Sequence, residues 1–162
     1  MNHKLAYKAD ISSLRSIHIF NDELEKYLNE IKSPEFECQI HYNFIENCGP
    51  HWNGFRCFLM DNKNRSLYYL HIGLIFHPDT KKGIMVELDR ASNSNTYKKI
   101  RNDIKEGRLY ELNKDETNYL KLFLNEKKLE KANKSNKIEI QLKIIKDFLL
   151  EALTAIIRGG RE

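Results

Sequence analysis

The apolar residues in the first fifth of the chain follow the 3.6-residue period of a helix. Asp10 is a suitable N-cap for this segment, and the pair Ser33-Pro34 is a signal for its end. The apolar positions between them are Ile11, Leu14, Ile17, Leu24, Leu28 and Ile31. The pattern therefore predicts a helical N-terminal segment. Asn21-Asp22-Glu23 is a second capping sequence, which leaves open one helix or two.

Between residues 36 and 90 the period changes from 3.6 to 2. In FECQIHYNF (36–44) apolar and polar residues alternate, as in a half-buried strand. The segments FRCFLMD (55–61), SLYYLHIGLIFH (66–77) and IMVELDR (84–90) predict three further strands, separated by short turn-rich connections. Connections this short join antiparallel neighbours, because a parallel crossover needs about a dozen residues or more. We therefore expect a four-stranded antiparallel meander.

After this region the helical period returns, and three C-terminal helices are predicted. Their expected limits are Ser94 or Asn95 to Gly107, Asn113 to Leu124, and Ser135 to Gly159-Gly160. The second of these carries Tyr119, Leu120, Phe123 and Leu124, and the third carries Ile138, Leu142, Ile145, Leu149, Leu153 and Ile156. The whole pattern predicts one α+β domain over residues 1–162, with the three C-terminal helices packed on one face of the sheet.

Composition is that of a globular protein, with 41% hydrophobic and 31% charged residues. No run of 18 or more apolar residues predicts a membrane span, and the N-terminal residues lack the apolar region of a secretory signal. The chain has three cysteines, an odd number that argues against a disulfide framework and suits a reducing compartment. We therefore expect a cytoplasmic protein that does not associate with membranes.

All three cysteines and two histidines fall in one segment, CQIHYNFIENCGPHWNGFRC, residues 38–57. A zinc site needs four ligands, and a pair two residues apart, such as Cys48 and His51, often supplies two of them. Cys38 and His41 do not fit this scheme, because residues an odd number apart on a strand point to opposite faces. We therefore favour thiols packed in the core over a metal site.

The turn in this segment contains His51 and the only tryptophan, Trp52. An exposed aromatic residue on a loop is a typical anchor of a protein interface. Alternatively, Trp52 folds back over the edge of the core and only stabilises the domain. We keep His51 and Trp52 as binding candidates and leave this choice open.

The second hairpin predicts a polar face that carries a histidine and carboxylates. Matching apolar to apolar positions pairs Phe76 with Ile84, Leu74 with Val86 and Ile72 with Leu88. On the other face, His71 then lies across from Asp89, and Gly73 leaves room across from Glu87, with Asp79 near the turn. Two carboxylates and an imidazole on one face are suitable ligands for Mg²⁺ or Mn²⁺.

Pro78-Asp79, seven residues and then Glu87-Leu88-Asp89 resemble the hairpin of PD-(D/E)XK nucleases over about twelve residues. The resemblance implies a metal-dependent nuclease that uses Asp79, Glu87, Asp89 and His71. The family's lysine, two positions after the second acid, is here Asp89. We therefore favour a cross-strand His–Asp pair, which stabilises a sheet by roughly 0.2–1 kcal/mol, and assign no catalytic residues, metal or cofactor.

Charge is unevenly distributed along the chain, whose net charge is +4. Residues 1–61 hold six basic and nine acidic side chains, a net charge of −3, and the remainder carries +7. Lys127, Lys128, Lys131 and Lys134 begin a lysine-rich stretch that is suited to phosphate contacts. That stretch lacks arginine and interleaved aromatic residues, so a solvated helix face is the alternative to nucleic-acid binding.

No nucleotide-binding glycine loop, nucleophile elbow or Ser–His–Asp arrangement is present. The small, motif-poor chain, rich in Lys, Asn and Ile, is similar in general build to phage-encoded anti-defence proteins, including anti-CRISPR proteins. The similarity involves no shared motif. It implies a non-catalytic, protein-binding inhibitor or adaptor that docks on a CRISPR or other defence nuclease. The candidate binding surfaces are the polar sheet face around His71, Glu87 and Asp89, the Trp52 loop and the acidic N-terminal helix. A metal-dependent nuclease and a nucleic-acid-binding accessory protein are the alternatives.

Overall fold

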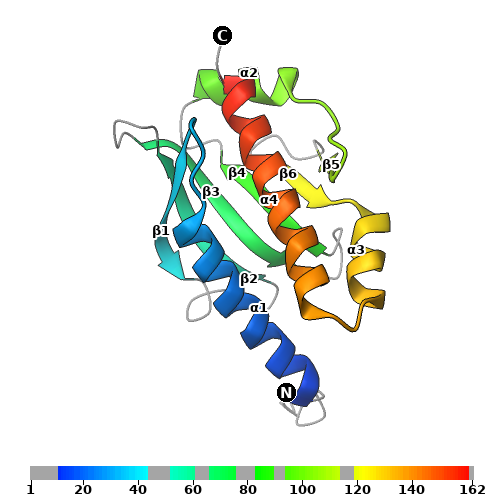
Figure 1. Ribbon diagram of the computed structural model, residues 1–162. Helices are drawn as coiled ribbons and strands as arrows, with labels where there is room; N and C mark the ends of the chain where they lie inside the picture. The colour runs from blue at the N-terminus through cyan, green and yellow to red at the C-terminus, as the bar shows by residue number, and fades with distance from the viewer. Residues whose placement is uncertain are drawn as a thin grey trace, which may run out of the picture.

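In a computed structural model, the described part of the chain forms one six-stranded antiparallel sheet and four helices (Figure 1). The structure describes residues 11–43, 52–60, 66–75, 83–89, 94–113 and 119–160. The helices are α1 (Ile11–Glu30), α2 (Ser94–Asp103), α3 (Glu126–Lys134) and α4 (Ile138–Gly160). The strands are β1 (Glu37–Asn43), β2 (Trp52–Met60), β3 (Ser66–Ile75), β4 (Gly83–Asp89), β5 (Tyr110–Asn113) and β6 (Tyr119–Leu124). The predicted α+β class and antiparallel sheet are confirmed.

The sheet order is β1-β2-β3-β4-β6-β5, so the prediction of only four strands is wrong. Residues 119–124, which were expected to lie in a helix that begins at Asn113, instead form β6, which pairs with β5. Within β6, Leu120 and Leu122 pair with Leu88 and Val86 of β4. A short apolar run is compatible with either period, and here pairing with the open edge of β4 determines the strand.

The predicted helical N-terminal segment is confirmed as one continuous helix, so of the two alternatives left open at residues 21–23 the undivided helix is the one observed. Asn21, Leu24 and Leu28 share one face of α1 and are all buried, and this packing holds the helix together through the second capping sequence. The predicted stop at Ser33-Pro34 is confirmed. The Ser33 hydroxyl accepts hydrogen bonds from the backbone N–H groups of Glu35 and Phe36, at 3.0 and 3.1 Å.

One face of the sheet forms the main core with α1, α2 and α4, and α1 and α4 lie across this face in Figure 1. Members of this core include Leu28 of α1, Leu70 and Val86 of the sheet, Ile100 of α2, and Phe148, Leu149 and Leu153 of α4. Ile138, which was expected in the core, is instead 41% exposed at the start of α4. None of the described helices combines the length and apolar character needed to span a membrane.

The pairing of β3 with β4 differs from the prediction by two residues. Ile72 pairs with Val86, and His71 pairs with Glu87. Since side chains along a strand alternate with a period of 2, a shift of two changes the partners but keeps each side chain on its predicted face. The sequence pattern alone does not distinguish the two registers, because both place apolar residues opposite apolar residues.

Candidate functional site

Three ionisable side chains meet on the sheet face opposite the main core, one each from β3, β4 and β6. His71 Nδ1 lies 2.7 Å from Glu87 Oε1, and Lys121 Nζ lies 3.7 Å from Glu87 Oε2. Glu87 is only 3% exposed and Lys121 only 6%. We call this group the His71–Glu87–Lys121 network. Its carboxylate has one partner on each neighbouring strand, so the network links three strands.

His71 Nδ1 and Glu87 Oε1 share a hydrogen bond that orients the imidazole ring. This is how carboxylates orient histidines in acid–base sites. The network also adjoins a second apolar cluster formed by Ile75, Met85 and Phe123. Burial beside apolar side chains makes the partnership of Glu87 with His71 and Lys121 important for stability, because a buried charge needs a partner.

The predicted pairing of His71 with Asp89 is wrong, because His71 pairs with Glu87 on β4. No group of three or more His, Cys, Asp or Glu side chains suited to a metal ion occurs among the described residues. Asp79 and His51 lie outside the described residues, and Trp52 begins β2 with its side chain outside them. The nuclease alternative, which depends on Asp79, stays a prediction.

Gly73 has a role different from the predicted opening beside Glu87. It pairs with Met85 on β4 and lies directly opposite Gly54 on β2. A Cβ atom on Gly73 would collide with the carbonyl oxygen of Asn53 and the Cα of Gly54. The two glycines therefore allow the backbones of β2 and β3 to approach closely.

The cysteines that the structure describes, Cys38 and Cys57, are buried free thiols in the main core. A hydrogen bond with Cys38, followed by burial, raises the pKa of the Cys57 thiol well above its usual range. His41 lies on the other face, with its ring 4.9 Å from that of Phe58. The expectation that Cys38 and His41 point to opposite faces is confirmed.

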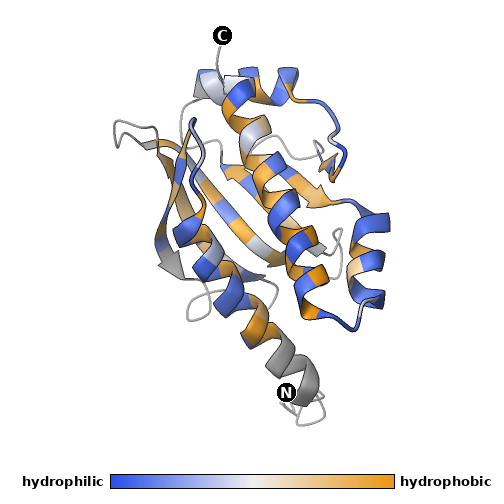
Figure 2. Cartoon of the chain, in the orientation of Figure 1, coloured by the Kyte–Doolittle hydropathy of each residue, from blue (hydrophilic) through white to orange (hydrophobic). Residues whose placement is uncertain are grey.

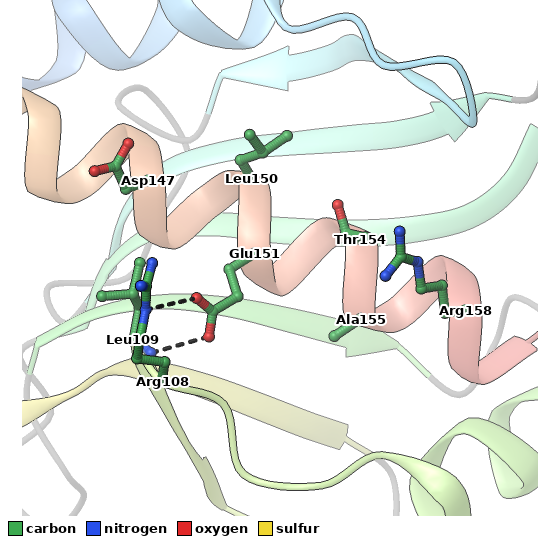
Figure 3. Close-up of a pocket in the computed structure, with 8 residues that line it drawn as sticks. All are labelled: Arg108, Leu109, Asp147, Leu150, Glu151, Thr154, Ala155 and Arg158. Atoms are coloured by element: carbon green, nitrogen blue, oxygen red, sulfur yellow. Dashed lines mark hydrogen bonds and ion pairs between the residues drawn. The ribbon is translucent and has the colours of Figure 1, made fainter.

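A second candidate site is a groove along the surface of α4. Two adjoining hollows of about 520 and 480 Å³ share Arg108, Leu109 and Asp147. The first is lined further by Leu150, Glu151, Thr154, Ala155 and Arg158, and the second by Lys128, Lys131, Glu139, Ile140, Lys143 and Ile144. We call the two hollows together the α4 groove. Figure 3 shows the first, with α4 on one side and Arg108 and Leu109 on the other.

Glu151 of α4 holds the segment with Arg108 and Leu109 on the opposite side of the groove. Its carboxylate accepts a hydrogen bond from the backbone N–H of Leu109 at 3.0 Å, and the Nε of Arg108 lies 4.0 Å away (Figure 3). Within α4, Lys143 Nζ lies 3.0 Å from Asp147 Oδ2. Two of the acidic groups along the groove therefore already have partners within the protein.

Apolar side chains remain exposed in this groove. Ile140 is 41% exposed and Leu150 43%, on the face of α4 that turns away from the sheet. Figure 2 shows α4 as a mixture of hydrophobic and hydrophilic residues along its whole length. In the sequence, the final helix carries apolar residues on two of its faces, and this pattern was the signal for the groove. Only one of the two faces was interpreted as core.

The lysines singled out by sequence divide between two positions. Lys128 and Lys131 line the α4 groove. Lys127 and Lys134 are exposed outside the groove lining, and Lys134 Nζ lies 3.5 Å from Glu130 Oε2. Sequence reasoning missed Arg108 and Lys121, which contribute to the groove and to the network on the sheet.

Comparison of the chain with protein-family models, with curated proteins and with solved structures found no match. Function is therefore inferred from the two surfaces themselves. The His71–Glu87–Lys121 network is largely buried, whereas the α4 groove presents apolar and cationic groups to solvent. Of the two, the groove has the features of a binding site for a second molecule.

Proposed function

We propose that this protein is a non-catalytic binding protein, an inhibitor or adaptor, that docks on a protein partner through the α4 groove. The observation that carries the proposal is the exposure of Ile140 and Leu150, at 41% and 43%, inside a lined groove. Apolar side chains gathered in a hollow with a polar rim are typical of protein-binding surfaces. None of the described residues that line the groove is aromatic, so stacking of nucleic-acid bases is not favoured there.

The shape and charge of the groove favour an acidic, amphipathic helix as its occupant. From Ile140 to Arg158 the groove follows α4 for 19 residues, with about 27 Å between the first and the last at the rise of an α-helix. Arg108, Lys128 and Lys131 add positive charge along the wall opposite α4. A partner helix with apolar residues at positions i, i+4 and i+7 and carboxylates beside them complements this surface.

The finer form of the proposal is a partner that belongs to a defence system, namely a CRISPR or other nuclease. It is supported by the similarity in build to phage-encoded anti-defence proteins and by the absence of a complete catalytic set in the sequence. In this form, the acidic helix is a surface element of the nuclease. Binding there inhibits by occupying a surface that the nuclease needs, without mimicry of DNA.

Binding to the groove is tested with a fluorescein-labelled peptide of about 18 residues that forms an acidic amphipathic helix. We expect saturable fluorescence anisotropy, loss of at least about tenfold in affinity for Leu150→Glu and Ile140→Glu, and no binding of a peptide with lysine in place of glutamate. Ile138→Glu is the matched control, because Ile138 is equally exposed on α4 but does not line the groove. Equal effects of all three substitutions would refute docking in the groove.

The finer form is tested in cells that carry an active CRISPR nuclease directed against a phage. Expression of the protein should restore plaque formation, and Leu150→Glu should abolish this protection while Ile138→Glu keeps it. If the protein protects against no nuclease of a representative panel, the anti-defence form is refuted. The peptide experiment then decides whether the groove is a binding site. Cleavage of nucleic acid by the purified protein with Mn²⁺ or Mg²⁺ would contradict a non-catalytic role.

A further inference from the structure

We propose that the sheet face opposite α1 and α4 is a binding platform for single-stranded nucleic acid, on which bases stack against Phe58, Tyr69 and His41. This function goes beyond the proposed protein docking, because it uses the other side of the molecule. We call the three side chains the ring platform. They come from adjacent strands, with His41 on β1, Phe58 on β2 and Tyr69 on β3.

The rings of the platform form a continuous surface. The centroid of Phe58 lies 4.9 Å from that of His41 and 5.0 Å from that of Tyr69. The planes are inclined by 63° and 42°, respectively. In such an inclined contact the edge of one ring covers at most one face of its neighbour, and a flat base can stack on a face that no neighbour covers. His41 is exposed, and Phe58 and Tyr69 are half-buried.

An irregularity of β1 contributes His41 to the platform. The pairing of β1 with β2 shifts between Ile40 and Tyr42, so His41 is the extra residue of a β-bulge. A bulge redirects the side chain at its position and is frequent beside functional sites. Here it accompanies an exposed imidazole whose ring lies directly beside the ring of Phe58.

A cationic side chain lies on the same face as the rings. The guanidinium of Arg56 is 5.6 Å from the centroid of the Tyr69 ring. The chain as a whole carries a net charge of +4, which attracts a polyanion at long range. Aromatic faces beside cations are the recurring composition of sites that bind single strands without sequence preference.

The presence of aromatic side chains distinguishes this sheet face from the lysine-rich helix α3. Lys127 and Lys134 offer charge, and the described part of α3 has no aromatic side chain. A duplex hides its bases from a flat platform, whereas a single strand exposes them for stacking. The ring platform therefore favours a single strand over a duplex. It also favours a single strand over an aliphatic protein surface, which suits the α4 groove instead.

The test is fluorescence anisotropy with a labelled 12-nucleotide oligouridylate at low salt. Phe58→Leu and Tyr69→Leu, which keep an apolar side chain and remove the ring, should each weaken binding by about fivefold or more. Lys127→Gln, in an exposed position on α3, is the control and should keep most of the affinity. Circular dichroism and thermal melting confirm that each variant is folded.

A salt series adds a readout that a merely structural role does not change. For a single strand, the slope of log K against log salt concentration is about −0.7 per phosphate neutralised, so Arg56→Gln should make the slope shallower by about 0.7. No binding at low salt, equal binding of duplex RNA, or full affinity in both leucine variants would each overturn the platform. Loss of binding in Lys127→Gln alone would assign it to the lysine helix instead, which also overturns the proposal.

Discussion

Replacing Glu87 with glutamine will strongly destabilise the fold, because Glu87 is the shared partner of two other ionisable groups. The substitution keeps the volume of the side chain and removes its charge. Lys121, whose side chain is 8% exposed, then loses the anion 3.7 Å from its ammonium group. His71 loses a charged acceptor at 2.7 Å.

The expected loss is about 3–5 kcal/mol of unfolding free energy, the range found when one partner is removed from a buried ion pair. A folded domain has only about 5–15 kcal/mol in total. For a domain of this size, each kcal/mol corresponds to roughly 2–4 °C in the midpoint of thermal unfolding, so we expect a decrease of roughly 6–20 °C. Urea unfolding followed by circular dichroism measures the free energy directly.

A double-mutant cycle separates the ion pair from general disruption. Lys121→Met alone should also destabilise, whereas the double variant Glu87→Gln, Lys121→Met should lose less than the sum of the two single variants, by about 1–3 kcal/mol. The reasoning is refuted if Glu87→Gln lowers stability by less than about 1 kcal/mol, or if the two losses simply add.

Three further predictions test the fold. Gly73→Ala should lower the free energy of unfolding, measured by urea denaturation, by more than about 1 kcal/mol. Gly159→Ala is the control and should be neutral or stabilising, because a Cβ atom there makes only ordinary contacts in α4. Equal effects of the two substitutions would contradict the close approach of β2 and β3. Burial, with a smaller contribution from Asp147, raises the pKa of Tyr27 to about 12. The unfolded chain releases this proton near pH 10, so stability should fall between about pH 10 and 12, and a Tyr27→Phe variant with an unchanged alkaline decline would refute this. Cys57 should resist a thiol reagent at pH 8 until the chain unfolds, and rapid labelling of Cys57 in the native state, located by mass spectrometry, would contradict its burial.

The side-chain faces of β2, β3 and β4, and of β1 as far as Ile40, were predictable because they depend on a local pattern; the β-bulge at His41 interrupts it. Alternation along each strand places Leu70 and Ile72 in the core and His71 on the other face, and the structure agrees. The fold class followed from the same alternation together with short connections between strands. Neither inference required knowledge of contacts between distant parts of the chain.

What the sequence could not provide is pairing between distant segments. Residues 119–124 fit a helix or a strand, and only the edge of β4 decides between them. The pairing of His71 with Glu87 differs from the predicted register by two residues. Lys121 reaches Glu87 only because β6 lies beside β4, so the network had no signature within either segment.

The α4 groove was accessible from sequence only in part. Lys128 and Lys131 stood out through local charge. Leu109 and Glu151, which join the wall to α4, are 42 positions apart, and no short-range pattern relates them. Leu150 is an apolar residue in an apolar helix, so its sequence context does not predict exposure. It is exposed because the other face of α4 packs on the sheet.

Methyl NMR spectra of the isoleucine and leucine side chains, recorded during titration with the acidic helical peptide, test docking in the α4 groove most directly. Docking there predicts saturable shifts for the methyl groups of Ile140, Ile144 and Leu150, with Ile138 unchanged as an exposed neighbour outside the groove lining. Saturable shifts confined to the sheet strands, or no saturable shifts in α4 at any peptide concentration, would contradict it.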